Sequence, residues 1–124
     1  MHIDQASYLS LMTIRKNGSE VLTPVWFATA DSTSYYCFSA AEAGKVKRIR
    51  NNKLVKIATC DVRGGSLGGW VDCQAQLIDK LDEQALAYSL LIKKYGWQMR
   101  LTNFFSAISG KINKRRVIRL DVIQ

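Results

Sequence analysis

The chain has few of the residues that build disulfide frameworks or zinc sites. Its 124 residues include only three cysteines, Cys37, Cys60 and Cys73, which are widely spaced and form no Cys-x-x-Cys pair. The single histidine is His2, close to the start of the chain. A structural zinc needs four such ligands, and a disulfide framework needs paired cysteines. We therefore expect reduced thiols packed in strands, and no metal site.

Proline and long apolar runs are scarce as well. Pro24 is the only proline, and no stretch approaches the roughly 20 apolar residues of a membrane span. The first residues lack a basic region followed by an apolar run, so no secretory signal is expected. Apolar residues make up 48% and charged residues 23%, as in an ordinary globular protein. The sequence predicts one domain over residues 1–124, in the cytoplasm.

Acidic residues are outnumbered, with 10 Asp and Glu against 18 Lys and Arg, which gives a net charge of +8. This balance favours an anionic partner: a nucleic acid, a membrane surface or a phosphorylated ligand. A basic cluster near the C-terminus is the argument for nucleic acid. No reading helix or aromatic platform accompanies it, so neither nucleic acid nor membrane is the expected partner. The cluster consists of Lys111, Lys114, Arg115, Arg116 and Arg119.

Side chains for a protein-only catalytic site are also few. Asp61 and Asp72 lie on adjacent predicted strands, but nothing in the sequence places them in one pocket. The glycine loop at 64–69 lacks the Gly-Lys-Ser/Thr of a P-loop and precedes a strand. It is therefore either a connection between strands or a lid over a ligand. If the protein is an enzyme, we expect a cofactor to carry the chemistry, and we assign no catalytic residue.

The pattern that is present is mainly that of short strands. Residues 8–15 and 20–30 predict a hairpin around an Asn-Gly turn signal at 17–18. Pro24, which has no N–H, is expected at an edge or a bulge. The cleanest alternation of apolar and polar residues is at 70–78. Further strands are predicted at 34–39, 54–62 and 116–123.

Helical spacing appears in three places. Val46 and Ile49 share one face and predict a short amphipathic helix over 44–52. Asp82 is a plausible N-cap for a helix that runs to about Tyr95 and ends at Gly96. A further helix is predicted at about 98–109. Six strands, a short crossover helix and a late helical insertion predict a mainly β fold, an antiparallel barrel rather than a doubly wound sheet.

The basic segment 44–50 is the first candidate site. Lysine and arginine are strong donors to phosphate, and a helix N-terminus adds free N–H groups and a favourable dipole. Ser39 ends a strand shortly before Gly44, which relaxes the backbone. By charge alone, a solvated helix face is the alternative. The basic residues of the first turn are Lys45, Lys47 and Arg48.

The run Thr-Pro-Val-Trp-Phe at 23–27 is the second candidate site. A proline interrupts the strand ladder and frees nearby backbone groups to contact a ligand, and Trp26 offers a flat apolar ring. The alternative is a barrel edge that carries two core aromatic residues, Trp26 and Phe27.

The order of these features resembles a known family. The run at 23–27 is followed by a tyrosine-rich strand at 34–39, the basic segment at 44–52 and a strand that closes with Arg63-Gly64. Together these resemble the pyridoxamine-phosphate-oxidase-like split β-barrel superfamily over roughly residues 8–78. Within it, the nearest group is the small deazaflavin-dependent proteins, which use coenzyme F-420 or a flavin such as FMN.

The resemblance implies a six-stranded, FMN-binding-like split β-barrel and a homodimer with cofactor sites at the subunit interface. It implies an oxidoreductase that moves a hydride to or from a small organic substrate with FMN or the deazaflavin F-420. A non-catalytic flavin or haem carrier is the alternative. The Arg-x-x-Leu-Leu-Lys signature of true pyridoxamine-phosphate oxidases is absent, so vitamin B6 oxidation is not expected.

The resemblance also implies cofactor-binding residues. Lys45 and Arg48 would hold the cofactor phosphate, with Lys47 as a neighbour. The end of the preceding strand would approach the same phosphate with Ser39 and Ala40. The isoalloxazine ring would lie along Pro24, Val25 and Trp26.

Overall fold

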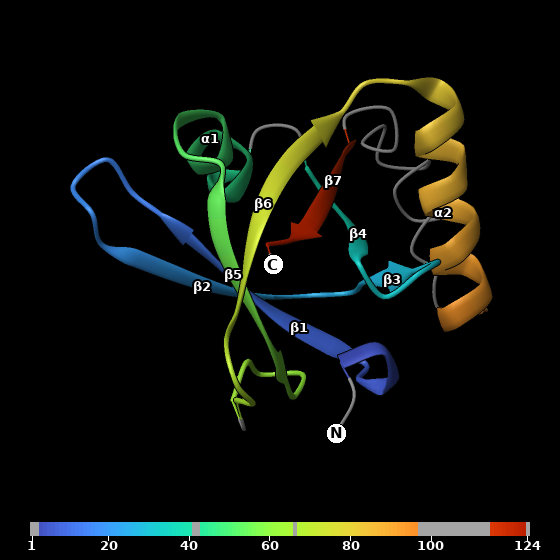
Figure 1. The fold of residues 1–124 in the computed structure, drawn as a ribbon, viewed down its shortest axis with the longest axis horizontal. Coiled ribbons are helices and arrows are strands. Elements are labelled where there is room, and N and C mark those ends of the chain that lie inside the picture. The colour runs from blue at the N-terminus through green and yellow to red at the C-terminus, as the bar shows by residue number, and fades with distance from the viewer. Residues whose placement is uncertain (1–2, 41–42, 66, 97–114, 124) are drawn as a thin grey trace.

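The computed structural model describes residues 3–40, 43–65, 67–96 and 115–123 (Figure 1). The predicted helix at 98–109 and the basic residues Lys111 and Lys114 lie outside these ranges. No described helix has the length and apolarity needed to cross a lipid bilayer. The elements are η1 (Ile3–Gln5), β1 (Tyr8–Ile14), β2 (Glu20–Val25), β3 (Ala28–Thr29), β4 (Ser34–Ala40), α1 (Gly44–Asn51), β5 (Leu54–Cys60), β6 (Val71–Ile78), α2 (Leu81–Tyr95) and β7 (Arg115–Val122).

All strands form one antiparallel sheet in the order β2-β1-β5-β6-β7-β4-β3. The two edge strands, β2 and β3, follow each other in the chain and are separated only by Trp26 and Phe27. The chain therefore passes from one edge of the sheet to the other, and the sheet curls into a split barrel (Figure 1). The predicted mainly β, split-barrel fold is confirmed.

The predicted count of six strands is wrong by one, for a local reason. Periodicity runs unbroken through 20–30, but the segment changes partners at Trp26 and Phe27: β2 pairs with β1, whereas β3 pairs with β4. Pro24 does lie in an edge strand, opposite Ser10. The Asn-Gly turn is also confirmed, because Gly18 has a positive φ of 88° and donates to the Arg15 carbonyl.

The barrel interior is filled by the inward residues of the strands. Leu9, Leu11, Ile57, Ile118 and Leu120 are each fully buried there. In β6 the predicted alternation holds, since cysteine and alanine at 73 and 75 are buried while the residues at 72 and 74 are exposed. The three cysteines lie in β4, β5 and β6, as expected, and all are free thiols.

The long helix α2 covers the outer face of the sheet around β3 and β4 (Figure 1). It begins at Leu81 with Lys80 as the N-cap, so the predicted cap at Asp82 is wrong. Asp82 instead lies in the first turn, where acidic residues also favour the helix dipole, and its carboxylate accepts from the Glu83 N–H at 2.8 Å. The predicted end is confirmed, because Gly96 takes a φ of +61° directly after Tyr95.

Candidate functional site

The short helix α1 lies at one end of the barrel, away from η1 and the N-terminus (Figure 1). Val46 and Ile49 are buried in the barrel core, as their spacing predicts, and they fix the helix on the barrel end. No side chain caps the helix at Ala43, and its first turn carries no acidic residue. The first turn of α1 therefore presents a positive helix end without a carboxylate of its own.

Arg48 folds back from the middle of α1 across this helix end. Its Nε donates to Oγ1 of Thr13 in β1 at 2.6 Å, and Thr13 is fully buried. Its guanidinium lies against Gly44, where an added Cβ would be only 2.6 Å from Nη1. The glycine is thus required for this close approach, which the sequence suggested only as backbone relaxation.

Lys45 is half-buried beside the inward face of β4. Burial lowers the pKa of Lys45, and the Arg48 guanidinium lowers it further, while the Cys37 thiol opposes this. Burial in turn raises the pKa of Cys37 to about 12, so this thiol stays neutral at pH 7. The Lys45 ammonium therefore interacts electrostatically with both Cys37 and Arg48.

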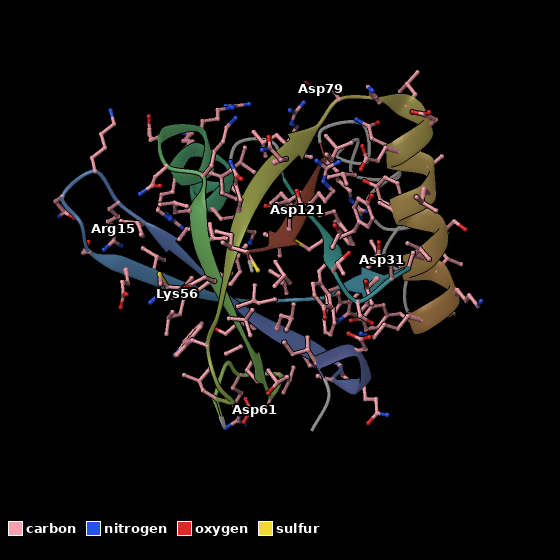
Figure 2. All side chains as sticks on the ribbon, in the orientation of Figure 1. Arg15, Asp31, Lys56, Asp61, Asp79 and Asp121 are labelled. Carbon is pink, nitrogen blue, oxygen red and sulfur yellow. The ribbon has the colours of Figure 1, made fainter. Side chains whose placement is uncertain are left out.

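A third cation contributes to the same region. Arg15 follows β1 on the hairpin (Figure 2). Its charge adds to the effect of burial in lowering the pKa of Arg48. Among the described residues, the ion pairs involve other cations, Lys56, Arg116 and Arg119. Lys45 and Arg48 thus share a helix N-terminus with no described acidic partner. The two positive charges repel each other, and a site of this kind is suited to binding an anion.

We refer to Thr13, Gly44, Lys45 and Arg48 as the α1 cluster. The other residues predicted around the phosphate lie beside it with different exposures. Lys47 is exposed and points away from the core, so it is a neighbour at most. Ser39 is buried near the end of β4 opposite Arg116, and Ala40 ends the same strand opposite Arg115.

The predicted ring-binding residues at 24–26 differ from one another. Pro24 is exposed on the outer side of the strand, and Val25 is buried in the barrel core. Trp26 packs under α2, with its ring stacked on Tyr95 at 4.6 Å between centroids and 12° between planes. One face of the indole is therefore already covered by a residue that the sequence did not single out.

The α1 cluster and the predicted ring-binding residues at 24–26 are separated along the barrel wall. Val25 lies opposite Leu9, and Thr13 lies four residues further along β1. At a rise of about 3.3 Å per residue, this separation is about 13 Å along the strand. A ligand that touched both places would have to be elongated, with an anionic group at one end.

The remaining predicted acidic groups do not form a shared site. The Asp61 carboxylate accepts from the backbone N–H groups of Arg63 and Gly65, in the turn at the barrel end away from α1 (Figure 2). Asp72 pairs with Lys56 across β5 and β6 and lines a different cavity from Asp61. Within the described ranges, no cluster of three or more His, Cys, Asp or Glu residues could hold a metal ion.

Two residues of the site region were missed because their partners are distant in the sequence. Thr13 contacts a residue of α1, and no motif marks it. Tyr95 accepts from the Phe27 N–H at 2.9 Å, and its hydroxyl lies within hydrogen-bond distance of the Ser7 and Phe27 carbonyls. Neither position carries a local signal that a single sequence could reveal.

Comparisons with known structures support this geometry at the level of the fold. A FAD-binding protein from Mesorhizobium loti has a TM-score of 0.67 at 20% identity, covering 99% of this chain and 84% of that one. The heme storage protein HutZ from Vibrio cholerae has a TM-score of 0.71 at 16% identity, covering 97% and 84%. An F420 reductase has a TM-score of 0.64 at 15% identity, covering 99% and 91%.

At these identities the structural neighbours establish the fold alone, and no curated protein sequence matches the chain. The family model described as pyridoxamine 5'-phosphate oxidase, however, matches residues 2–124, nearly the whole chain. The resemblance drawn from the order of motifs is thereby confirmed, and the chain belongs to the pyridoxamine 5'-phosphate oxidase family of split β-barrels.

Proposed function

We propose that this protein binds a flavin-type cofactor, FMN or the deazaflavin F-420, through its phosphate and acts as an oxidoreductase on a small organic substrate. One observation carries the proposal: Lys45 and Arg48 converge, half-buried, on the N-terminus of α1 with no described acidic partner. A half-buried lysine and a neighbouring arginine at the positive end of a helix repel each other, and a bound anion would offset that repulsion. A cofactor phosphate supplies that charge.

The remaining residues fit the elongated shape of such a cofactor. With its phosphate at the α1 cluster, the ring system would have to reach about 13 Å along the barrel wall toward Pro24 and Trp26, at the strand rise of about 3.3 Å per residue, because Val25 is buried in the core. There Trp26, whose one face is covered by Tyr95, would offer the other face of its indole to the ring. The cofactor would supply the hydride chemistry, and this chain would bind and orient it.

Titration of the cofactor-free protein with FMN, F-420 and riboflavin tests the proposal. Lys45→Ala and Arg48→Ala should each weaken FMN or F-420 binding by about 1–3 kcal/mol, the range of hydrogen bonds to charged groups. Arg50→Ala is the matched control, because Arg50 is an exposed cation on the same helix. Equal affinities in both site variants and the control would refute the phosphate site.

A measurement of catalytic turnover distinguishes an oxidoreductase from a non-catalytic carrier. A flavin or haem carrier remains the second candidate, because the fold is shared with a heme storage protein and acid–base side chains are few. Steady-state assays with several electron acceptors, on protein loaded with its cofactor, should show turnover if the protein is an oxidoreductase. A bound cofactor without turnover would favour the carrier.

We further propose that the protein is a homodimer with the cofactor sites at the subunit interface. The outer face of β1, β5 and β6 carries an apolar cavity of about 300 Å³ lined by Met12, Ile14 and Leu54. Lys56 and Asp72 lie at its edge, one cation and one anion, which two copies related by a two-fold axis can pair reciprocally. Leu54 is 57% exposed and Ile123, which lines the same cavity, is 48% exposed, so the two belong to one apolar patch that a second copy could cover.

Sedimentation velocity at micromolar concentration should give the mass of a dimer. Leu54→Asp should shift the protein toward the monomer and weaken cofactor binding with it. Leu81→Asp is the control, since Leu81 is also exposed but lies at the start of α2. A wild-type monomer that binds its cofactor fully would contradict the interface.

A further inference from the structure

The side chain of Thr13 is the only described hydrogen-bond partner of the Arg48 guanidinium and lies 35 residues away in the sequence. We propose that Thr13 is a positioning residue that presets the Arg48 guanidinium for a phosphate group and so gives the site its preference for phosphorylated over phosphate-free cofactors. This inference rests on the proposed function and adds to it a residue that no motif identifies.

The support for Arg48 is rigid. Thr13 is fully buried in β1, a strand that is hydrogen-bonded to β2 on one side and β5 on the other. Its Oγ1 accepts from Arg48 Nε at 2.6 Å, so a long side chain from α1 is anchored to the barrel wall at its guanidinium end. Anchoring removes rotamer freedom that the arginine would otherwise lose on binding a ligand.

The orientation that this bond imposes suits a phosphate. A guanidinium has five N–H donors in a fixed plane, and Thr13 occupies the one on Nε. The four donors on Nη1 and Nη2 remain for two phosphate oxygens, the bidentate arrangement that arginine favours. The close approach of Nη1 to Gly44 keeps these donors at the first turn of α1, beside Lys45.

A purely structural role for Thr13 makes a different prediction. If the hydroxyl serves only the fold, its removal should lower stability and affect all ligands equally. If it presets Arg48, its removal should weaken binding of FMN and leave riboflavin, which lacks the phosphate, unchanged. The ratio of the two dissociation constants therefore separates the two roles.

The test is a set of titrations with FMN and riboflavin, with thermal unfolding to verify the fold. Thr13→Val keeps the shape but loses the hydroxyl, and should weaken FMN binding about tenfold, the effect of one charge-assisted hydrogen bond. Thr13→Ser should restore it. Ser10→Ala is the control, because it removes a buried, unpaired hydroxyl from the same strand.

A double-mutant cycle completes the test and separates the two proposals. In an Arg48→Ala background, Thr13→Val should have no further effect on FMN binding, because the residue acts through Arg48. Thr13→Ala serves the same cycle if the valine variant does not fold. If Arg48→Ala weakens FMN or F-420 binding but Thr13→Val does not, the positioning role is overturned. If the wild type binds neither FMN nor F-420 better than riboflavin, the proposed phosphate site itself fails.

Discussion

The rings of Trp26 and Tyr95 stack at 4.6 Å between centroids, although they belong to the break between two edge strands and to the last turn of α2. The same tyrosine accepts a hydrogen bond from the Phe27 backbone at 2.9 Å. Tyr95 of α2 thus contacts both residues that separate β2 from β3, Trp26 through its ring and Phe27 through its hydroxyl. This contact ties the last turn of α2 to the barrel edge and covers one face of the predicted ring-binding tryptophan.

Tyr95→Phe should therefore destabilise the protein while leaving the ring stack in place. The substitution leaves the Phe27 N–H without its partner in a half-buried position, which costs about 1–3 kcal/mol. Urea unfolding gives this difference directly. Tyr88→Phe is the comparison, because Tyr88 is a half-buried tyrosine of the same helix whose hydroxyl bonds the Arg115 side chain instead of a backbone group. Equal midpoints for the two variants would argue against the contact.

Gly44→Ala should separate binding from stability. Gly44 has no positive φ, so alanine fits the backbone, and alanine favours a helix by about 0.5–1 kcal/mol over glycine. The new Cβ would meet Arg48 Nη1 at 2.6 Å and displace a flexible guanidinium rather than the core. We expect unfolding within about 1 kcal/mol of the wild type, and weaker FMN binding by a comparable or larger amount.

Calorimetric titration of FMN and thermal unfolding of the same sample measure both effects. Gly69→Ala is the control, because an added Cβ there meets no atom within 4 Å and Gly69 has no positive φ. Full FMN affinity in Gly44→Ala would mean that the observed position of Arg48 is not needed for binding.

Much of this architecture follows from local patterns in the sequence. Alternation of apolar and polar residues located the strands, and the Val46–Ile49 spacing located α1, because both patterns depend on near neighbours. The change of partners at Trp26 was not predictable, since the strand-like pattern continues through it. Pairing across a sheet depends on residues far away in the chain.

The candidate site was predictable only in part, for the same reason. Lys45 and Arg48 could be proposed because the basic segment after Gly44 matches the family resemblance, and their role as phosphate ligands stays a prediction. The bond to Thr13 joins residues 35 apart in the sequence and leaves no trace in either segment. Contact of Trp26 with a cofactor ring stays a prediction. Tyr95 covers one face of the indole, and no sequence motif indicates that stack.

Lys45 should make cofactor binding depend on pH in the alkaline range. Burial lowers the pKa of Lys45 in the free protein, and a bound phosphate favours the charged amine and raises that pKa again. The affinity for the cofactor is then at its full value below the pKa of Lys45 in the free protein. It falls as the pH rises from there toward the pKa of Lys45 in the complex. Loss should begin below the ordinary lysine value of about 10.4.

Dissociation constants for FMN and riboflavin between neutral pH and mildly alkaline pH test this dependence. Riboflavin binding should be flat, because it carries no phosphate. Lys45→Arg should flatten the FMN curve as well, since a guanidinium stays charged throughout this range. A wild-type FMN curve that matches the riboflavin curve would remove Lys45 from the phosphate site.

A separate polar network under α2 should govern acid stability. Tyr36 in β4 donates to Glu83 at 2.6 Å, and Arg119 in β7 pairs with the same carboxylate oxygen at 2.7 Å. These two hydrogen bonds lower the pKa of Glu83 in the folded protein. A carboxylate whose folded pKa is depressed contributes stability above its unfolded pKa, about 4.3, and loses that contribution as the pH falls through the folded pKa.

Glu83→Gln should therefore lower stability near pH 7 by about 1 kcal/mol, a modest value because the side chain is 21% exposed and partly screened. The difference from the wild type should shrink as the pH falls below about 4.3, where the wild-type carboxylate also loses its charge. Urea midpoints across this range measure the effect. Glu20→Gln makes the same charge change on the exposed strand β2 and should show no such convergence. If the two variants behave alike, the network does not hold α2 on the sheet, and the apolar contacts of Ala87 and Leu91 must carry that role alone.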